Sequence, residues 1–375
     1  MTTFVKYLDQ VEIPSLGTIN VFNTIDLTGL YDSDATGVIV QAWNSNVGPG
    51  ADFMTTVEVG TPSTHSTRQR FLPYHWMQTA ISLVGGTSIS VKPASANQKL
   101  YIAGEIFDDN AVVHAAPIYH NLGSPFDVWQ NVTATPDGTD VLGDISAVIV
   151  RSVSGGAGKI GVRQGGTTSP HDTMEWEQGM TWWVVGVNTS GIYEVWTGGK
   201  DEDENYYFAE IGYIKKTSRV TTVAEYYSAG DIAPGTQGSF GALDLTGVVP
   251  ANTVTAGFWW YAQSMPSALE AAYLRNTGSS EDDNSLTGLF NDGPHHQTQF
   301  VGVDANLACE YRLSDALIEL YLMWYETTVG TDFAEVETNA HMGHGVGAHA
   351  TTVHGAEAKP VISGAGGAVA YMGVS

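Results

Sequence analysis

The chain has 375 residues, of which 43% are hydrophobic and 10% aromatic, a composition that supports a folded core and excludes wholesale disorder. Its 40 acidic and 15 basic residues leave a formal net charge of −25, which repels phosphate backbones and argues against nucleic acid as a partner. The sequence has no apolar run of about 18 residues, and its first residues lack the basic and apolar regions of a secretory signal. We therefore expect synthesis in the cytoplasm without a signal peptide and without membrane insertion.

Three stretches of the chain begin with the same kind of signal, a polar turn followed by an apolar strand. The apolar strands are residues 38–40, 148–150 and 258–260, and they are spaced by 110 residues. Similar signals that recur in the same order predict three copies of one structural unit. After an N-terminal segment, 1–17, we place the copies at 18–110, 126–217 and 237–329.

Each copy continues with two apolar runs around a short turn, at 81–92, 184–196 and 300–313, which predicts a hairpin. An aromatic-rich strand then closes the copy, at 99–107, 206–214 and 319–327. Short runs with turns between them and little helical periodicity predict an antiparallel β-sandwich of jelly-roll or Greek-key type. The predicted fold class is thus all-β, with three tandem sandwiches followed by a C-terminal tail.

Three other stretches are placed by the repeat pattern. Residues 267–276 contain good helix formers, but they align with 156–165 in the second copy and are predicted to be a strand. Residues 114–125 and 226–238 carry Pro and Gly where copies end, and are predicted to be linkers.

The second copy contains a literal match to the G-x-G-x-x-G nucleotide fingerprint between Gly156 and Gly161. That fingerprint requires a helix directly after the glycines, and residues 162–172 cannot begin one. A phosphate-binding P-loop also fails, because Ile160 follows Lys159 where Ser or Thr is needed. We interpret the stretch as a strand, a glycine-rich turn and a strand that form a hairpin, and we expect no nucleotide cofactor.

The tail, 330–375, differs in composition from the repeats, since it is rich in Gly and contains His341, His344, His349 and His354. Histidines at short spacing are possible metal ligands, within one chain or around the axis of an oligomer, and His341, His344 and His349 are the candidates. The alternative is that they are ordinary polar residues of a docking or assembly segment that becomes ordered on association. We favour the second interpretation.

Other polar groups are weaker candidates for chemistry. The acidic loops 200–205 and 279–284 lack the spacing of a dedicated calcium loop, so solvated turns are the favoured interpretation. His295 and His296 are adjacent in a predicted strand and would point to opposite faces. Glu175 and Glu177 are a carboxylate pair of the kind that glycosidases use, but any acidic protein offers such pairs, and no catalytic motif is present.

The aromatic residues and the single cysteine are interpreted mainly as core residues. The 10 tryptophans include adjacent pairs in predicted strands, where alternate residues must face the core. Cys309 lies in a strand-like context, where we expect a small buried apolar residue. Asn131 and Asn188 begin N-x-[ST] sequons and are possible glycosylation sites.

Tandem β-sandwich copies, an acidic surface and a glycine-rich tail resemble the virion appendage proteins of tailed phages and archaeal viruses. These include decoration proteins, turrets, head spikes and tail fibres, and the resemblance is one of architecture over the whole chain. It implies a structural protein of the virion surface and not an enzyme, which forms a homotrimer or homopentamer and contacts capsid or tail proteins. Contact with a host-surface glycan or receptor is compatible with it.

Two alternatives from other classes stay open. A carbohydrate-binding adhesin would present exposed aromatic rings to sugars and would score on a glycan array. A glycan-degrading enzyme with accessory sandwiches would hold paired, perturbed carboxylates in a cleft of one copy and release reducing ends.

Overall fold

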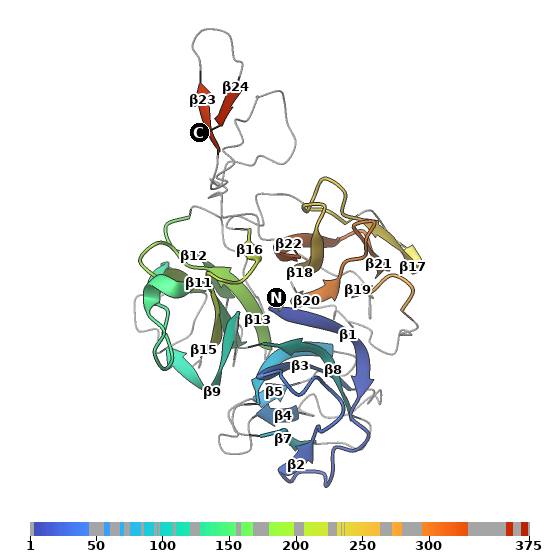
Figure 1. Cartoon of the computed structure of the whole chain (residues 1–375). Coiled ribbons are helices and arrows are strands. Elements are labelled where there is room, and N and C mark those ends of the chain that lie inside the picture. Colours follow the sequence, from blue (N-terminus) through green and yellow to red (C-terminus); the bar gives the residue numbers. More distant parts are fainter. Residues whose placement is uncertain are drawn as a thin grey trace.

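Figure 1 shows the computed structural model of the chain, which is all-β and is built from antiparallel sheets. The structure describes residues 4–44, 56–60, 68–70, 76–83, 86–93, 96, 98–107, 110–120, 128–154, 159–167, 180–198, 206–223, 231–233, 235, 237–262, 272–279, 295–328, 358–362 and 369–373. Within these ranges, no helix has the length and apolar character needed to cross a membrane.

Three β-sandwiches follow one another along the chain. Each has a four-stranded sheet, which we call the larger sheet because it contains more residues, and a second sheet, which we call the smaller sheet, with four strands in the first sandwich and three in the others. The first has the orders β1-β8-β3-β6 and β2-β7-β4-β5, the second β9-β15-β11-β13 and β10-β14-β12, and the third β16-β22-β18-β20 and β17-β21-β19. The strands of the first are β1 Val5–Glu12, β2 Asn23–Asp26, β3 Gly37–Asn44, β4 Thr56–Gly60, β5 Arg68–Arg70, β6 Trp76–Ser82, β7 Ser88–Lys92 and β8 Gln98–Ile106. Those of the second are β9 Ala111–His120, β10 Gln130–Thr133, β11 Ile145–Ser154, β12 Lys159–Gln164, β13 Met180–Gly186, β14 Ile192–Gly198 and β15 Tyr206–Lys215, with a 3-10 turn η1 at Leu142–Asp144. Those of the third are β16 Val220–Thr222, β17 Gln237–Asp244, β18 Thr253–Ala262, β19 Ala272–Arg275, β20 His295–Gly302, β21 Ala308–Leu313 and β22 Ile318–Thr327. Two further strands, β23 Ala358–Ile362 and β24 Val369–Gly373, pair antiparallel in the C-terminal segment.

Apart from the extra strand β5, the three sandwiches share one topology, which confirms the predicted all-β class. Each closing aromatic strand is central in its larger sheet and pairs with β3, β11 or β18 through a bulge at the same place. The bulges follow Ile39, Ile149 and Gly257, so Val40 and Val150 are equivalent to Phe258. The predicted 110-residue spacing is therefore two residues wrong for the third copy, because apolar runs alone do not define the register.

The larger sheets are buried on both faces. In the first sandwich, Val38 and Val40 lie in its own core, whereas Ile39 between them belongs to a cluster shared with the other sandwiches. Trp259 of the third sandwich enters the same shared cluster, while Phe258 and Trp260 pack inside their own sandwich. Because both faces are covered, these strands are continuously apolar instead of alternating with polar residues.

The three larger sheets meet around a common centre, which we call the ring (Figure 1). The equivalent strands β6, β13 and β20 contact one another, and each also contacts the first strand of the next sandwich: β9, β16 and β1, respectively. Polar bonds link the sandwiches there, since the Phe300 N–H donates to Gln78 Oε1 at 3.2 Å and the Thr298 hydroxyl donates to the Trp182 carbonyl. Contacts that repeat in cyclic order give the chain pseudo-threefold symmetry.

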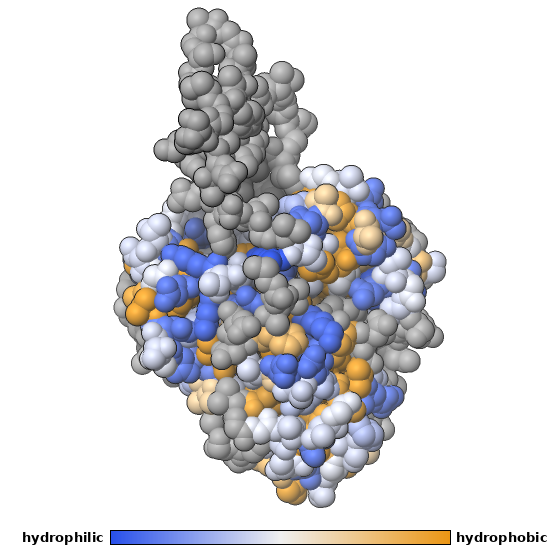
Figure 2. Space-filling view, viewed as in Figure 1, coloured by the Kyte–Doolittle hydropathy of each residue, from blue (hydrophilic) through white to orange (hydrophobic). Residues whose placement is uncertain are grey.

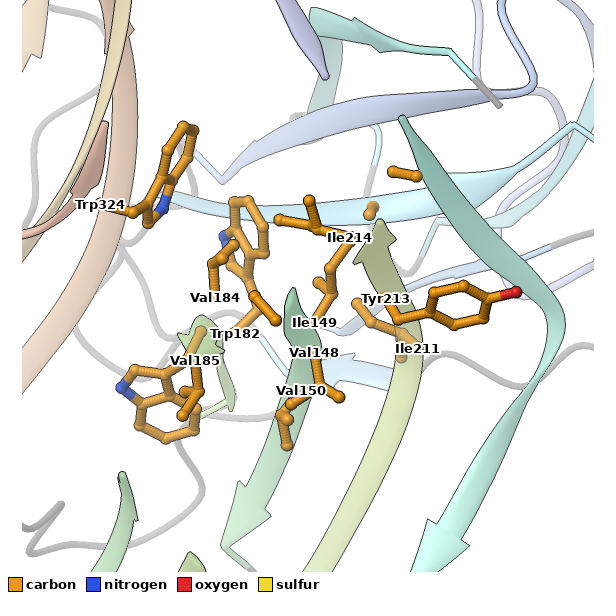
Figure 3. Close-up of a cluster of buried hydrophobic side chains, with 14 of the residues drawn as sticks. Val148, Ile149, Val150, Trp182, Val184, Val185, Ile211, Tyr213, Ile214 and Trp324 are labelled. Carbon is orange, nitrogen blue, oxygen red and sulfur yellow. The ribbon is translucent and has the colours of Figure 1, made fainter. Parts of the chain in front are cut away.

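Large aromatic side chains fill the space where the three sandwiches meet. In Figure 3, Trp324 of the third sandwich lies near Trp182 and Val184 of the second, and all three belong to the same buried cluster. The indole of Trp324 covers Gly257, where an added Cβ would lie 2.0 Å from the indole nitrogen. A side chain at position 257 would therefore displace Trp324 from the shared core.

The predicted hairpins at 81–92, 184–196 and 300–313 are wrong as hairpins. Both strands exist in each case, but β6, β13 and β20 lie in the larger sheets, whereas β7, β14 and β21 lie in the smaller sheets. The turn is therefore a corner where the chain crosses from one layer to the other. The residues of the turn do not distinguish a hairpin from a corner between two sheets. Which of the two forms depends on the distant strands with which the flanking strands pair.

The hairpin predicted around the glycine motif is also wrong as a hairpin. Strands β11 and β12 flank it as predicted, and no helix follows the glycines in the described residues. They do not form a hairpin, because β11 pairs with β13 and β15 while β12 pairs with β14 in the opposite sheet. Residues 155–158 themselves lie outside the described part of the chain.

The sheets also reach beyond the predicted repeat boundaries. Strand β1 lies in the segment 1–17 and completes the first larger sheet by pairing with β8. Strand β9 occupies 111–120, so the start of the predicted linker 114–125 is a strand of the second sandwich. Pro117 is compatible with this position because β9 is an edge strand. Residues 272–275 form β19, as expected for the stretch 267–276.

Candidate functional site

The metal candidates His341, His344 and His349 of the tail lie outside the described residues, as does His354. The same holds for Glu175 and Glu177, and for the acidic loops 200–205 and 279–284 apart from Ser279. His295 and His296 are in β20, but the structure describes only their backbone. For these residues the sequence predictions stay predictions.

The two sequons lie in different settings. Asn131 is exposed in β10. Asn188 Oδ1 accepts hydrogen bonds from the N–H groups of Ser190 at 2.9 Å and Ile192 at 3.0 Å, so this side chain holds the corner between β13 and β14.

Most of the described tryptophans are core residues, as predicted. Trp182, Trp183, Trp259, Trp260 and Trp324 are all buried. Cys309 is buried as well, and burial raises the pKa of its thiol. On the face shown in Figure 2, hydrophilic and hydrophobic residues are interspersed. The large hydrophobic residues that are exposed in the described part of the chain are Ile19, Val21, Tyr119, Val128, Val141 and Leu317.

One polar cluster inside the second sandwich differs from everything around it. Glu210 of β15 is fully buried, with its carboxylate between two imidazoles from the edge strand β9. Its Oε1 lies 3.6 Å from His114 Nε2, and its Oε2 lies 3.5 Å from His120 Nε2. The backbone N–H of Thr135 donates to Oε1 at 2.9 Å. With Tyr193 of β14, whose pKa is influenced by Glu210, these side chains form what we call the Glu210 cluster: His114, His120, Tyr193 and Glu210.

The cluster reaches the surface on both sides of Glu210. His120 is 19% exposed, and His114 Nδ1 lies 3.9 Å from the exposed carboxylate of Asp137. Next to His114, the hydroxyl of Tyr213 donates to Asp140 Oδ2 at 2.6 Å, and Lys215 pairs with the same carboxylate at 3.1 Å. Charged groups therefore continue from the core to the solvent along one edge of the sandwich.

The environment keeps Glu210 ionised and Tyr193 neutral. Burial raises the pKa of Glu210, but His114, His120 and the Thr135 N–H together lower it by more, so the pKa lies below its ordinary value. Burial, reinforced by the Glu210 charge, raises the pKa of the Tyr193 hydroxyl. The cluster thus holds a buried, ionised carboxylate between two imidazoles.

The other two sandwiches place apolar residues at the same positions. Through the shared bulge, Glu210 is equivalent to Ile102 and Leu322, and Tyr193 of β14 is equivalent to Ile89 and Cys309. These four equivalent residues are all buried in the cores of their sandwiches. The fold is therefore built twice without the polar cluster, so the cluster is not a requirement of the topology.

The sequence does not predict this site. Its patterns place His114 and His120 in a linker and Glu210 in an ordinary strand. A comparison of the three repeats offers a signal for the site, because Glu210 stands at a position that is Ile102 in the first copy and Leu322 in the third.

The cluster has the donor types of a metal site but not the arrangement. Among the described residues, no group of three or more His, Cys, Asp or Glu side chains is placed to hold a metal ion. What the cluster offers is a fixed, buried negative charge between two imidazoles.

Fold and site together define an all-β protein of three sandwiches closed around one core, with a buried acid–histidine cluster in the second. Comparison with models of known protein families and with curated proteins finds no match to this chain.

Proposed function

We propose that this chain is a structural protein of a larger assembly, the virion surface being the location that its architecture suggests. The observation that supports this proposal is the ring, in which one chain arranges three sandwiches of one topology around a shared core. In such a design the centre of the molecule is devoted to packing. One chain of this kind supplies a pseudo-threefold unit without help from other subunits.

The proposed partners are further copies of the chain and other proteins of the assembly, such as capsid or tail proteins. In this proposal the segment 330–375 is the docking element, because the ring is already complete at the end of β22, at Thr327. A homotrimer or homopentamer would then form through the tail, while each ring keeps its own fold.

Light scattering on the purified full-length chain and on residues 1–329, at low and high salt, tests the proposal. We expect the full-length chain to be a trimer or pentamer and the shortened chain to be a monomer. Near-ultraviolet circular dichroism of both proteins is the control, since the tryptophan-rich shared core must stay folded. A full-length chain that is monomeric under every condition would contradict assembly through the tail.

A further inference from the structure

The ring has three junctions between neighbouring sandwiches, and the chain itself crosses only two of them. Between the first and second sandwiches, a turn joins β8 to β9, and the N–H groups of Asn110 and Ala111 donate to the Phe107 carbonyl, both at 3.2 Å. Between the second and third, the N–H of Ser218 donates to the Lys215 carbonyl at 2.9 Å within the turn from β15 to β16. At both junctions, local turn bonds thus satisfy N–H groups at the start of the next strand.

At the third junction, between the third sandwich and β1, the described residues contain no such turn bonds before β1. There the side-chain carboxyl group of Glu326 accepts the N–H of Phe4 at one oxygen and the N–H of Val5 at the other, the second at 3.2 Å. The Thr255 hydroxyl donates to the Val5 carbonyl at 3.5 Å, and the Phe4 ring packs edge-on against Trp324 at 5.7 Å. A single side chain takes the place of a covalent turn.

The equivalent positions in the other two sandwiches show that the shared topology does not require a glutamate here. Through the register with β1, β9 and β16, Glu326 corresponds to Ile106 and Ile214. Both isoleucines are fully buried, and Glu326 is 1% exposed. At this position, the ionisable residue therefore stands at the junction that no chain connection crosses, and isoleucine stands at the two others.

Glu326 is poised to change its charge near neutral pH. Burial raises its pKa to about 7, against the lowering effects of the Phe4 and Val5 N–H groups and of Arg219. Arg219, which precedes β16, is the charged group that acts on Glu326. On β1, the Lys6 ammonium is engaged elsewhere, with Glu105 at 2.9 Å and Asp32 at 4.0 Å.

We propose that Glu326 is a proton-controlled latch, which holds the first strand of the chain on the third sandwich and so opens or closes the ring. The inference rests on the ring that also supports the proposed function, and it adds a way to regulate that unit. A raised pKa in the folded state means that the contribution of Glu326 to the junction is full below about pH 4.5, its unfolded value. It declines as the pH rises through about 7, where the buried carboxyl ionises. The ring is closed firmly in mild acid and less firmly in mild alkali.

Amide hydrogen exchange on the full-length protein between pH 5.5 and 8.5, corrected for intrinsic exchange rates, tests the latch. We expect the protection of β1 amides to fall about tenfold between pH 6 and pH 8, while β9 and β16 change little. In Glu326→Gln, which keeps a carbonyl acceptor but carries no charge, this pH dependence should disappear. Glu210→Gln is the matched control, because it removes a buried carboxylate elsewhere and should leave the response of β1 in place.

Glu326→Ile, with the residue of the two other junctions, is the second variant in case the glutamine variant does not fold. Protection of β1 that does not depend on pH in the natural protein would overturn the proposal, as would an unchanged dependence in the variants. Neither result bears on the mass measured by light scattering, so failure of the latch and failure of the assembly proposal are distinguishable.

Discussion

The core of the second sandwich and the core of the first have the same strands in the same order, but different chemistry at the same depth. Where the first has Ile102 and Ile89, the second has Glu210 and Tyr193 with two histidines. The first sandwich shows that the topology forms with apolar residues at these two positions. The Glu210 cluster is therefore not required by the topology, and its buried carboxylate costs free energy unless it is paired.

The largest effect is expected when the glutamate is moved to the first sandwich without its partners. Ile102→Glu places a carboxylate in an apolar core whose described residues include no imidazole, so we expect a loss of about 4 kcal/mol or more in the free energy of unfolding. Urea unfolding followed by tryptophan fluorescence measures it. Ile102→Val is the control, with an expected loss of about 1 kcal/mol. A glutamate tolerated as well as valine would show that this core admits water.

A smaller effect is expected when the existing cluster loses one partner. His114→Ala leaves Glu210 with one imidazole fewer and a small cavity, which should cost about 3 kcal/mol by urea unfolding at pH 7. Replacing the cluster together, by His114→Leu, His120→Ile and Glu210→Ile, should cost much less, because apolar residues often substitute for a buried ion pair.

The same set of variants has a pH signature of defined sign. The lowered pKa of Glu210 means that its contribution is present above about pH 4.5 and is lost as the pH falls through the folded value. The natural protein should therefore lose stability more steeply in acid than the triple variant, as measured by urea midpoints between pH 3 and pH 7. Parallel acid profiles would contradict the pairing of Glu210 with the imidazoles.

The smallest expected effect concerns the corners, where the second and third sandwiches again differ. Gly191 has φ +72°, and the equivalent turn position in the third sandwich is Leu307 with φ +58°. Gly191→Ala should lower the free energy of unfolding by about 1 kcal/mol, because alanine would have to adopt the left-handed backbone conformation and its Cβ would lie 3.0 Å from Leu142. Leu307→Ala adds no such strain and serves as the comparison, with thermal unfolding as the measurement for both. An equal loss in the two variants would point to packing instead of backbone strain.

The sequence located the strands but did not show which strands pair with each other. Apolar runs and turn residues located β11, β13 and β15 correctly, and the repeated order of signals indicated three sandwiches. The same signals did not show that β11 and β12 belong to different sheets, or that β9 continues through a stretch containing proline. The Glu210 cluster was hidden for a related reason, since its members are far apart in the chain and only the register brings them together.

The sequence by itself determined the class of the fold, the sites of the strands and the burial of residues such as Trp260 and Cys309, because periodicity and hydrophobicity act locally. Only the tertiary structure decided which strands pair, which face of each larger sheet meets the centre, and that Glu326 caps the first strand of the ring. Pairing, packing and desolvation depend on residues far apart in the chain, and no local pattern contains that information.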